Sequence, residues 1–350
     1  MKREHCAIST LNVSPLHSTG ENVTKPYSPH SPKHDVSEEL TKVDVPTNKV
    51  GVNTDRSTEI MSPSIHYNIA SSKKLSMRER RETLTFSLLR FNNWVKNWLI
   101  QREMHYLTTA LKIRGVRVLD LGSGVGGDMW KYKNADVAAI TFVDTSARSI
   151  EEIKRRNTFK DMRVDTLLCD MSDVRLSKLL PFNHYDIVVS MFSLHYIFSD
   201  KMRVMTMFRM IYNTLPRGGH FIGIVSNGDV VHEKCINSSI NRGGFKHISG
   251  ENVWSFIPKR ERTHSKPSLF GESYKFSLKN AVYNCDEYFT CYEAIRDCAS
   301  CAGLKVVNWE PILSEYERYV SETSHKTDFC HLTTDLLKLE DCYYYFSLEK

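Results

Sequence analysis

Three carboxylates stand at regular points of the chain beside a run of glycines. Asp120 directly precedes the glycines of "DLGSGVGGD", Asp144 follows the run "AAITFV", and Asp170 follows "VDTLLC". Short apolar runs rich in branched residues are typical of buried strands. Because the carboxyl ends of parallel strands meet at one edge of a sheet, the three acids are expected to converge beside the glycine loop. There Asp144 could accept hydrogen bonds from ribose hydroxyls, and Asp170 from an adenine amino group.

The glycines themselves fit two kinds of loop. Gly122, Gly124 and Gly127 match the dinucleotide pattern G-x-G-x-x-G, whereas Gly122, Gly124 and Gly126 match the G-x-G-x-G loop of AdoMet-dependent methyltransferases. The glycines alone therefore leave NAD and AdoMet open. The acid before the first glycine and the turn "LPRGG" before a later strand favour AdoMet. Each acid could instead cap a helix, but three acids at three successive strand ends make that alternative the weaker one.

The stretch "RFNNWVKNWLI" (90–100) predicts a helix with an unusual polar face. Its apolar positions follow the i, i+3, i+4, i+7, i+8 spacing of one helix face: Phe91, Trp94, Val95, Trp98 and Leu99. Asn92, Asn93 and Lys96 form a short stripe on the other side. Asparagine is a poor helix former, so a face that needed only solubility would use Glu, Lys or Gln. We therefore expect this stripe to face bound ligands, while Asn97 has no assigned role.

The elements around these residues alternate between strand and helix patterns. Strand patterns at "VRVLDLG", "AAITFVDTS", "VDTLLCDMS", "HYDIVVSMFSLHY" and "HFIGIVSN" are separated by helical ones, notably over 146–157 and 200–215. This alternation predicts an α/β fold, with a mostly parallel sheet covered by helices on both faces. Residues 228–267 are polar and predict an irregular insertion. The next 45 or so residues predict strand, helix and strand, and "DCYYYFSLEK" predicts a final strand.

The overall composition indicates a globular domain behind a tail. The chain has 350 residues, of which 41% are hydrophobic and 25% charged. Residues 1–72 are rich in Ser, Thr and Pro and contain no Phe or Trp, which predicts a disordered tail before a domain over 73–350. No apolar run is long enough to span a membrane, and no secretory signal is evident. The net charge of +6 permits an anionic partner. The basic run Lys73–Glu82 fits a nuclear-import signal, an RNA contact or the solvated start of a helix.

The cysteine pattern points to reduced thiols. Nine cysteines occur without the dense spacing of a small disulfide framework. Cys298 and Cys301 have the spacing of a zinc-ligand pair, but no second close pair accompanies them. We expect them to be small buried hydrophobes, and we expect no metal.

The sequence resembles the eukaryotic mRNA cap guanine-N7 methyltransferases over about residues 86–350. The resemblance rests on "FNNWVKNWLI", "VLDLGSGVGGDMWKYK", "YDIVVSMFSLHYIF", "PRGGHFIG" and "LFGESYKFSL". It implies a class I, Rossmann-like methyltransferase sheet with a final antiparallel strand, and AdoMet as methyl donor. The residues that it implies for AdoMet are Lys96, Gly122, Asp144, Asp170, Met191 and Tyr196. Those that it implies for the cap are Asn92, Asn93, Arg156, His195, Glu287 and Tyr343, with Arg156 near the cap phosphates.

The implied reaction moves a methyl group to N7 of the terminal guanosine of the 5′ GpppN cap of nascent mRNA. Guanine N7 carries a free lone pair, so the attack needs no general base and no catalytic residue in the strict sense. Catalysis can rest on alignment and on a suitable electrostatic field, supplied by a pocket that includes His195, Tyr196 and Glu287. Glu287 as a carboxylate could accept hydrogen bonds from guanine N1–H and the amino group. Basic residues would meet the triphosphate bridge.

Two positions depart from the family pattern. Val125 stands where the family has a lysine in "DLGCGKGGD", and Met191 stands where the family has a glutamine. The first change removes a phosphate contact, and the second removes a polar group beside AdoMet. These two changes bear on the affinity for the cap and on the rate of methyl transfer more than on the fold.

The resemblance also implies surroundings for the reaction. Capped RNA is the expected partner, with RNA polymerase II or other capping enzymes as further candidates, a nuclear location and a monomeric state. Two other functions stay open. Another AdoMet-dependent RNA or small-molecule methyltransferase would leave Asn92, Asn93 and Glu287 without a role. A catalytically weak cap- or RNA-binding subunit has the Val125 and Met191 departures as its support.

Overall fold

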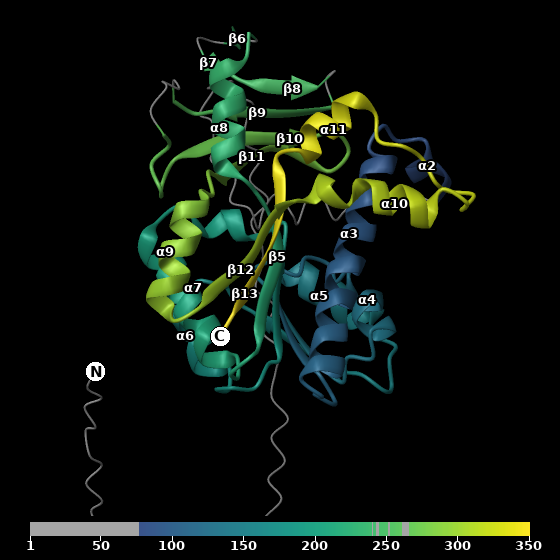
Figure 1. Cartoon of the computed structure of the whole chain (residues 1–350), viewed down its shortest axis with the longest axis vertical. Helices are drawn as coiled ribbons and strands as arrows, with labels where there is room; N and C mark the ends of the chain where they lie inside the picture. Colours follow the sequence, from purple (N-terminus) through teal and green to yellow (C-terminus); the bar gives the residue numbers. More distant parts are fainter. Residues whose placement is uncertain (1–76, 240, 243–244, 251–252, 261–265) are drawn as a thin grey trace, which may run out of the picture. The chain divides into compact units, whose positions relative to one another are not determined.

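Seven strands form the main sheet of the computed structural model (Figure 1). The structure describes residues 77–350 except 240, 243–244, 251–252 and 261–265. The predicted tail and the first part of the basic run therefore lie outside the described residues. The strand order is β12-β13-β5-β4-β1-β2-β3. The strands are β1 (Arg117–Leu121), β2 (Ala139–Asp144), β3 (Arg163–Leu168), β4 (Ile187–Met191), β5 (His220–Ser226), β12 (Lys305–Pro311) and β13 (Tyr343–Glu349).

The sheet is mostly parallel and ends with one antiparallel strand. The neighbouring pairs from β3 through β5 are all parallel. The last strand, β13, lies between β5 and β12 and is antiparallel to both. The predicted α/β class, with a final antiparallel strand, is confirmed.

Helices cover both faces of this sheet, as predicted (Figure 1). One group comprises α3 (Phe86–His105), α4 (Met129–Asn134) and α5 (Ala147–Arg156), and the other comprises α6 (Val174–Leu179), α7 (Lys201–Thr214) and α9 (Tyr292–Ala302). Successive strand side chains point to opposite faces, so Val118 joins the core under the first group and Leu119 the core under the second. Burial on both faces explains why the strand sequences are continuously apolar rather than alternating.

Helix α3 packs its predicted apolar face onto the domain. Three of the five apolar residues are fully buried, and the two tryptophans are half-buried against the same core. The ring centroid of Phe91 lies 5.2 Å from that of Tyr319 in α10 (Tyr316–Thr323). The centroid of Trp98 lies 5.2 Å from that of Tyr345 in β13. The predicted packing face is confirmed, which fixes the direction in which the polar stripe points.

A second, antiparallel sheet occupies much of the segment predicted as an irregular insertion. Its strand order is β11-β10-β9-β8, and α8 (Gly228–Asn237) precedes it. The strands are β8 (Ile248–Gly250), β9 (Trp254–Pro258), β10 (Ser273–Leu278) and β11 (Val282–Tyr288), and a separate pair is formed by β6 (Asn241–Arg242) and β7 (Phe245–Lys246). The prediction of irregular structure over 228–267 is wrong for its described part. The segment predicted as one strand before α9 is likewise the hairpin β10–β11. Each of these strands mixes buried residues with partly buried ones, and β8 and β9 are short, so their apolar signal is weak.

The remaining described elements are short. They are α2 (Met77–Arg81), a π-helical turn η1 (Tyr106–Ala110), the 3-10 turns η2 (Leu194–Ile197) and η3 (Ile312–Glu315), and α11 (Thr334–Glu340). None of the helices in the described residues is long and apolar enough to cross a membrane. Within the same residues Cys298 is buried and Cys301 exposed, and no cluster of three or more His, Cys, Asp or Glu side chains could hold a metal ion.

Candidate functional site

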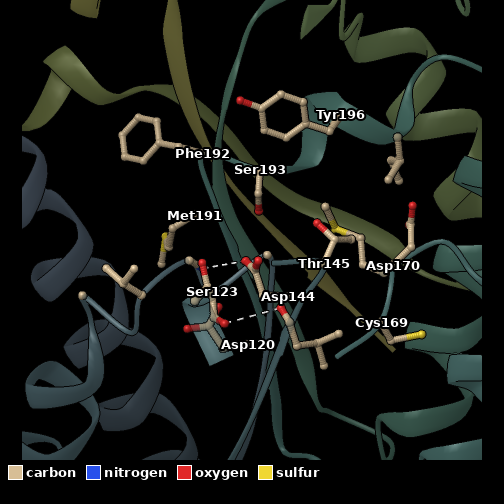
Figure 2. A pocket seen from close by; sticks show the side chains of 18 of the residues that line it. Asp120, Ser123, Asp144, Thr145, Cys169, Asp170, Met191, Phe192, Ser193 and Tyr196 are labelled. Atoms are coloured by element: carbon tan, nitrogen blue, oxygen red, sulfur yellow. Dashed lines mark hydrogen bonds between the residues drawn. The ribbon is translucent and has the colours of Figure 1, made fainter. Parts of the chain in front are cut away.

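A cavity of about 650 Å³, called the large cavity below, opens at the carboxyl ends of β1, β2 and β4 (Figure 2). All six residues that the sequence assigned to a cofactor line it: Lys96, Gly122, Asp144, Asp170, Met191 and Tyr196. The acids Asp120, Asp144 and Asp170 all reach this cavity from successive strand ends. The predicted convergence of three carboxylates beside the glycine loop is therefore confirmed.

Asp144 ties the glycine loop to the end of β2. Its carboxylate accepts hydrogen bonds from the backbone N–H groups of Gly124 and Ser146, each at 2.8 Å. Burial raises the pKa of Asp144, and these N–H groups oppose that rise. Gly122 has a φ of +74°, and a Cβ there would lie 2.5 Å from Ser193 Oγ. Only glycine fits this turn, which sets the backbone against the ligand space.

Asp170 is held by a partner that the sequence analysis missed. Arg203 Nη2, from α7, donates to Asp170 Oδ2 at 2.7 Å, and the Ser172 N–H donates to Oδ1 at 2.8 Å. Arg203 also lines the large cavity. An arginine in the first turn of a helical pattern, 33 positions away, carries no signal of this contact in the sequence. The two contacts hold the carboxylate in place in the wall of the large cavity.

Two lysines share one carboxylate at the start of α4. Lys96 Nζ lies 2.8 Å and Lys131 Nζ 2.6 Å from Asp128 Oδ1. Burial alone would raise the pKa of Asp128, but the two ammonium groups hold it below its usual value. Lys131 also donates to Asn93 Oδ1 at 3.0 Å. The cluster carries one surplus positive charge beside the glycine loop. The sequence analysis did not identify Lys131 and Asp128 as site residues.

A second cavity, called the small cavity below, has a volume of about 130 Å³. Four of the six residues assigned to the substrate line it: Asn92, His195, Glu287 and Tyr343. These residues come from α3, η2, β11 and β13, so the small cavity draws on both sheets and on α3. Phe192 and Tyr196 line both cavities. The two cavities therefore adjoin at these two aromatic side chains.

The polar groups of the small cavity are buried and largely uncharged. Glu287 is 3% exposed and accepts a hydrogen bond from Tyr274 O–H at 3.0 Å. Burial raises the pKa of Glu287 to about 8, although hydrogen bonds from Tyr274 and Tyr196 oppose this. His195 Nε2 lies 3.4 Å from Glu287 Oε1, and burial lowers the pKa of His195 to about 3. A neutral imidazole beside a protonated carboxyl is the expected state near neutral pH.

Phe192 holds a strained backbone where the cavities meet. Its φ is +56°, in the left-handed region that aromatic residues rarely adopt. Its N–H donates to Ile224 O at 2.8 Å, and its ring centroid lies 5.3 Å from that of Tyr343. Strain of this kind persists when the surroundings fix it, and it is concentrated at functional sites.

Two residues assigned to the substrate line neither cavity. Asn93 is exposed and is bound to Lys131, as described above. Arg156 donates to Glu152 Oε1 at 2.7 Å and to the carbonyl oxygen of Val125 at 3.1 Å. Both residues lie beside the glycine loop or the first turn of α4, outside the enclosed space. Val125, the position that departs from the family lysine, lines the large cavity, as does Met191.

Comparisons with known proteins agree on one family. A family model described as the mRNA (guanine-N(7))-methyltransferase domain matches residues 53–342. The mRNA cap guanine-N(7) methyltransferase of Schizosaccharomyces pombe is 30% identical over 261 residues, which are 71% of this chain and 67% of that protein. The protein of the same name from Cryptococcus neoformans (strain JEC21) is 30% identical over 69% of this chain, but the match spans only 38% of its own length. A rice relative, mRNA cap guanine-N(7) methyltransferase 1, is 28% identical over 79% of this chain and 73% of its own.

Proposed function

The chain belongs to the mRNA (guanine-N(7))-methyltransferase family, and we propose that it carries out the family's reaction across its two adjoining cavities. AdoMet would occupy the large cavity and the cap guanine the small one. The observation that carries this proposal is the boundary between them, where Phe192 and Tyr196 line both. A methyl donor and an acceptor base held on the two sides of this boundary would meet there.

The large cavity suits AdoMet. A Cβ added at Gly124 or Gly127 would meet nothing within 4 Å, so the loop backbone borders open space. Asp144 keeps lone pairs for ribose hydroxyls after its two backbone contacts, and Asp170 presents an acceptor for an adenine amino group. Lys96 supplies positive charge at the other side of the loop. When bound, AdoMet supplies a methyl group on a sulfonium, which a neutral nitrogen can attack.

The small cavity suits a guanine base. The Glu287 carboxyl is the acceptor for guanine N1–H and the 2-amino group, and aromatic side chains at Phe192 and Tyr343 border the ring. N7 needs no deprotonation, so the residues only orient the base toward the boundary and exclude water. Positive charge moves onto the guanine as the methyl transfers. A nearby carboxylate stabilises that charge without reorganising.

The triphosphate bridge would leave the small cavity beside the glycine loop. We assign its contacts to Arg156 and Asn93, which lie outside both cavities, and to the surplus charge shared by Lys96 and Lys131. Lys131 supplies a cation close to the loop in which Val125 replaces the family lysine. Guanidinium and ammonium groups are the usual partners of phosphate oxygens.

The finer biological setting is also a proposal. We propose that the substrate is the GpppN end of nascent transcripts, that the protein acts in the nucleus as a monomer, and that RNA polymerase II or other capping enzymes are its partners. The family's substrate, the mRNA cap, supports the first part. The boundary between tail and domain at residues 72/73 stays a prediction, and the family match begins earlier, at residue 53.

One assay tests the proposed function directly. Purified protein is incubated with methyl-labelled AdoMet and with GpppA-capped or uncapped RNA, and the digested product is analysed for N7-methylguanosine. We expect label at N7 with capped RNA only. AdoMet binding without any cap-dependent N7-methylguanosine would favour the weak binding subunit, and label on another atom or on a small molecule would favour the other methyltransferase class.

Cap binding is expected to tighten as the pH rises from about 6 to about 8. Burial raises the pKa of Glu287 to about 8, so the free protein holds this carboxyl protonated at neutral pH. Guanine N–H donors favour the carboxylate, so binding releases a proton and gains up to about tenfold in affinity per pH unit below that pKa. His195 stays neutral throughout, because burial lowers its pKa to about 3. Fluorescence titration with GpppA at several pH values measures the trend, which should vanish in Glu287→Gln; a flat wild-type profile would contradict it.

A further inference from the structure

A second carboxyl shares the small cavity with Glu287. Glu340, the last residue of α11, lines this cavity and is fully buried. None of the described residues that line the cavity is a lysine or an arginine. Burying an acid without a compensating cation is unfavourable, so the acid needs another reason to be there. The next residue, Asp341, caps α11 with a side chain that is about half exposed, so a carboxyl at this helix end does not have to point inward.

Glu340 is joined to the polar stripe of α3. Asn92 Nδ2 donates to Glu340 Oε1 at 3.1 Å, across 248 positions of sequence. The other oxygens of this pair, Asn92 Oδ1 and Glu340 Oε2, are buried and have no hydrogen-bond partner among the described residues. Buried polar atoms are nearly always paired, so two unpaired oxygens in the wall of one cavity indicate that a ligand supplies donors there.

The cap guanosine carries more donors than Glu287 can take. Guanine presents N1–H and two N–H bonds of its 2-amino group, and its ribose presents two hydroxyls. A carboxylate that binds N1–H and one amino N–H leaves the second amino N–H and the hydroxyls unpaired. Donors of this kind match the two acceptor oxygens at Asn92 and Glu340.

Resting on the function proposed above, we propose that Asn92 and Glu340 form a second recognition edge for the cap guanosine, which accepts a hydrogen bond from its remaining amino N–H or from a ribose hydroxyl. Burial raises the pKa of Glu340 to about 8, and the bond from Asn92 opposes this. As a carboxylate, Glu340 accepts through Oε2; when it is protonated, its carbonyl oxygen is the one that already accepts from Asn92, and the amide oxygen of Asn92 is the free acceptor in either state. The edge therefore does not depend on a buried negative charge.

Two variants and three cap analogues test this edge. Glu340→Leu removes both carboxyl oxygens, and Glu340→Gln keeps one acceptor for Asn92. Steady-state kcat and KM are measured with GpppA, with an inosine cap that lacks the 2-amino group, and with 2′- and 3′-deoxyguanosine caps. Circular dichroism and the Kd for AdoMet report on folding and on the large cavity. Asp341→Asn is the matched control, because it removes the next carboxyl of the chain, which pairs with Lys234 outside the cavity.

We expect Glu340→Leu to lower kcat/KM for GpppA by about tenfold or more, mainly through KM, with an unchanged Kd for AdoMet. A smaller wild-type-to-variant difference with the inosine cap would identify the amino group as the donor. The same result with a deoxyguanosine cap would identify a ribose hydroxyl. Glu340→Gln should have a kcat/KM between those of Glu340→Leu and the wild type. If the leucine variant does not fold, the comparison of Glu340→Gln with the wild type is the test.

Two results would overturn the proposal. One is an equal loss with every cap analogue, and the other is no loss in a folded variant; both would make Glu340 a packing residue. A wild-type protein that fails to methylate any capped RNA would instead refute the proposed function, so the two failures are distinguishable.

Discussion

Replacing Glu287 by glutamine is expected to lower kcat/KM for capped RNA by about 10²-fold or more and to leave the Kd for AdoMet unchanged. The glutamine amide keeps one acceptor oxygen but turns an N–H₂ group toward the donors of the guanine edge. Loss of one partner from a buried, charge-assisted pair costs about 2–5 kcal/mol, and each 1.36 kcal/mol is a factor of ten. Single-turnover methylation of GpppA-capped RNA measures the effect on rate, and calorimetry measures AdoMet binding.

The structure supplies a control for this substitution. Glu293 lies on the exposed side of the first turn of α9, so Glu293→Gln makes the same chemical change away from both cavities. It should keep the wild-type rate. If Glu287→Gln also kept the wild-type rate, Glu287 would be a structural acid held by Tyr274 rather than a guanine-binding one.

Replacing Asp144 by asparagine is expected to weaken AdoMet binding by about 10²-fold. The carboxylate has two duties: it accepts the N–H groups of Gly124 and Ser146, and it offers its remaining lone pairs to ribose hydroxyls. An amide in its place turns one acceptor into a donor that faces N–H or O–H groups. Hydrogen bonds to a charged group contribute about 1.5–3 kcal/mol each, so the loss of one or two gives an effect of this size. Calorimetric titration with AdoMet, or with its demethylated product, measures it.

Asp165 on the neighbouring strand β3 provides the comparison. Its side chain is about half exposed and pairs with Arg163 on its own strand, so Asp165→Asn removes a carboxylate from the same sheet without touching the large cavity. AdoMet affinity should be unchanged in that variant. An Asp144→Asn protein that binds AdoMet as tightly as the wild type would assign Asp144 to loop structure alone.

The parts of the fold that depend on local pattern could be predicted from the sequence. The buried strands are recognisable as uninterrupted runs of apolar, mostly branched residues, and each acid directly follows such a run. The acids lie together at one edge of the sheet because these strands pair in parallel. The packing face of α3 follows from its 3.6-residue period. The second sheet could not be predicted, because β8 has three residues and β9 alternates buried and half-buried positions amid polar sequence.

Side-chain contacts between segments far apart in the sequence could not be predicted either. Arg203 sits in an ordinary helical pattern and Glu340 at an ordinary helix end, and nothing local distinguishes them from solvated charges. Their roles appear only when α7 meets the end of β3 and when α11 meets α3. Asn93 and Arg156, which the resemblance placed at the substrate, line neither cavity and lie beside the glycine loop and α4, so their role toward the cap stays a prediction.

The position of β13 has a consequence for how the protein is made on the ribosome. This strand follows all the other described strands in the sequence, yet it inserts between β5 and β12. Until it is synthesised, the nascent chain exposes the unpaired edge of β5, which invites pairing with other chains and makes chaperone protection important. The small cavity needs Leu88 from the beginning of the domain and Tyr343 from this last strand. The small cavity, proposed above to hold the cap guanine, is therefore complete only when translation of the domain is nearly finished.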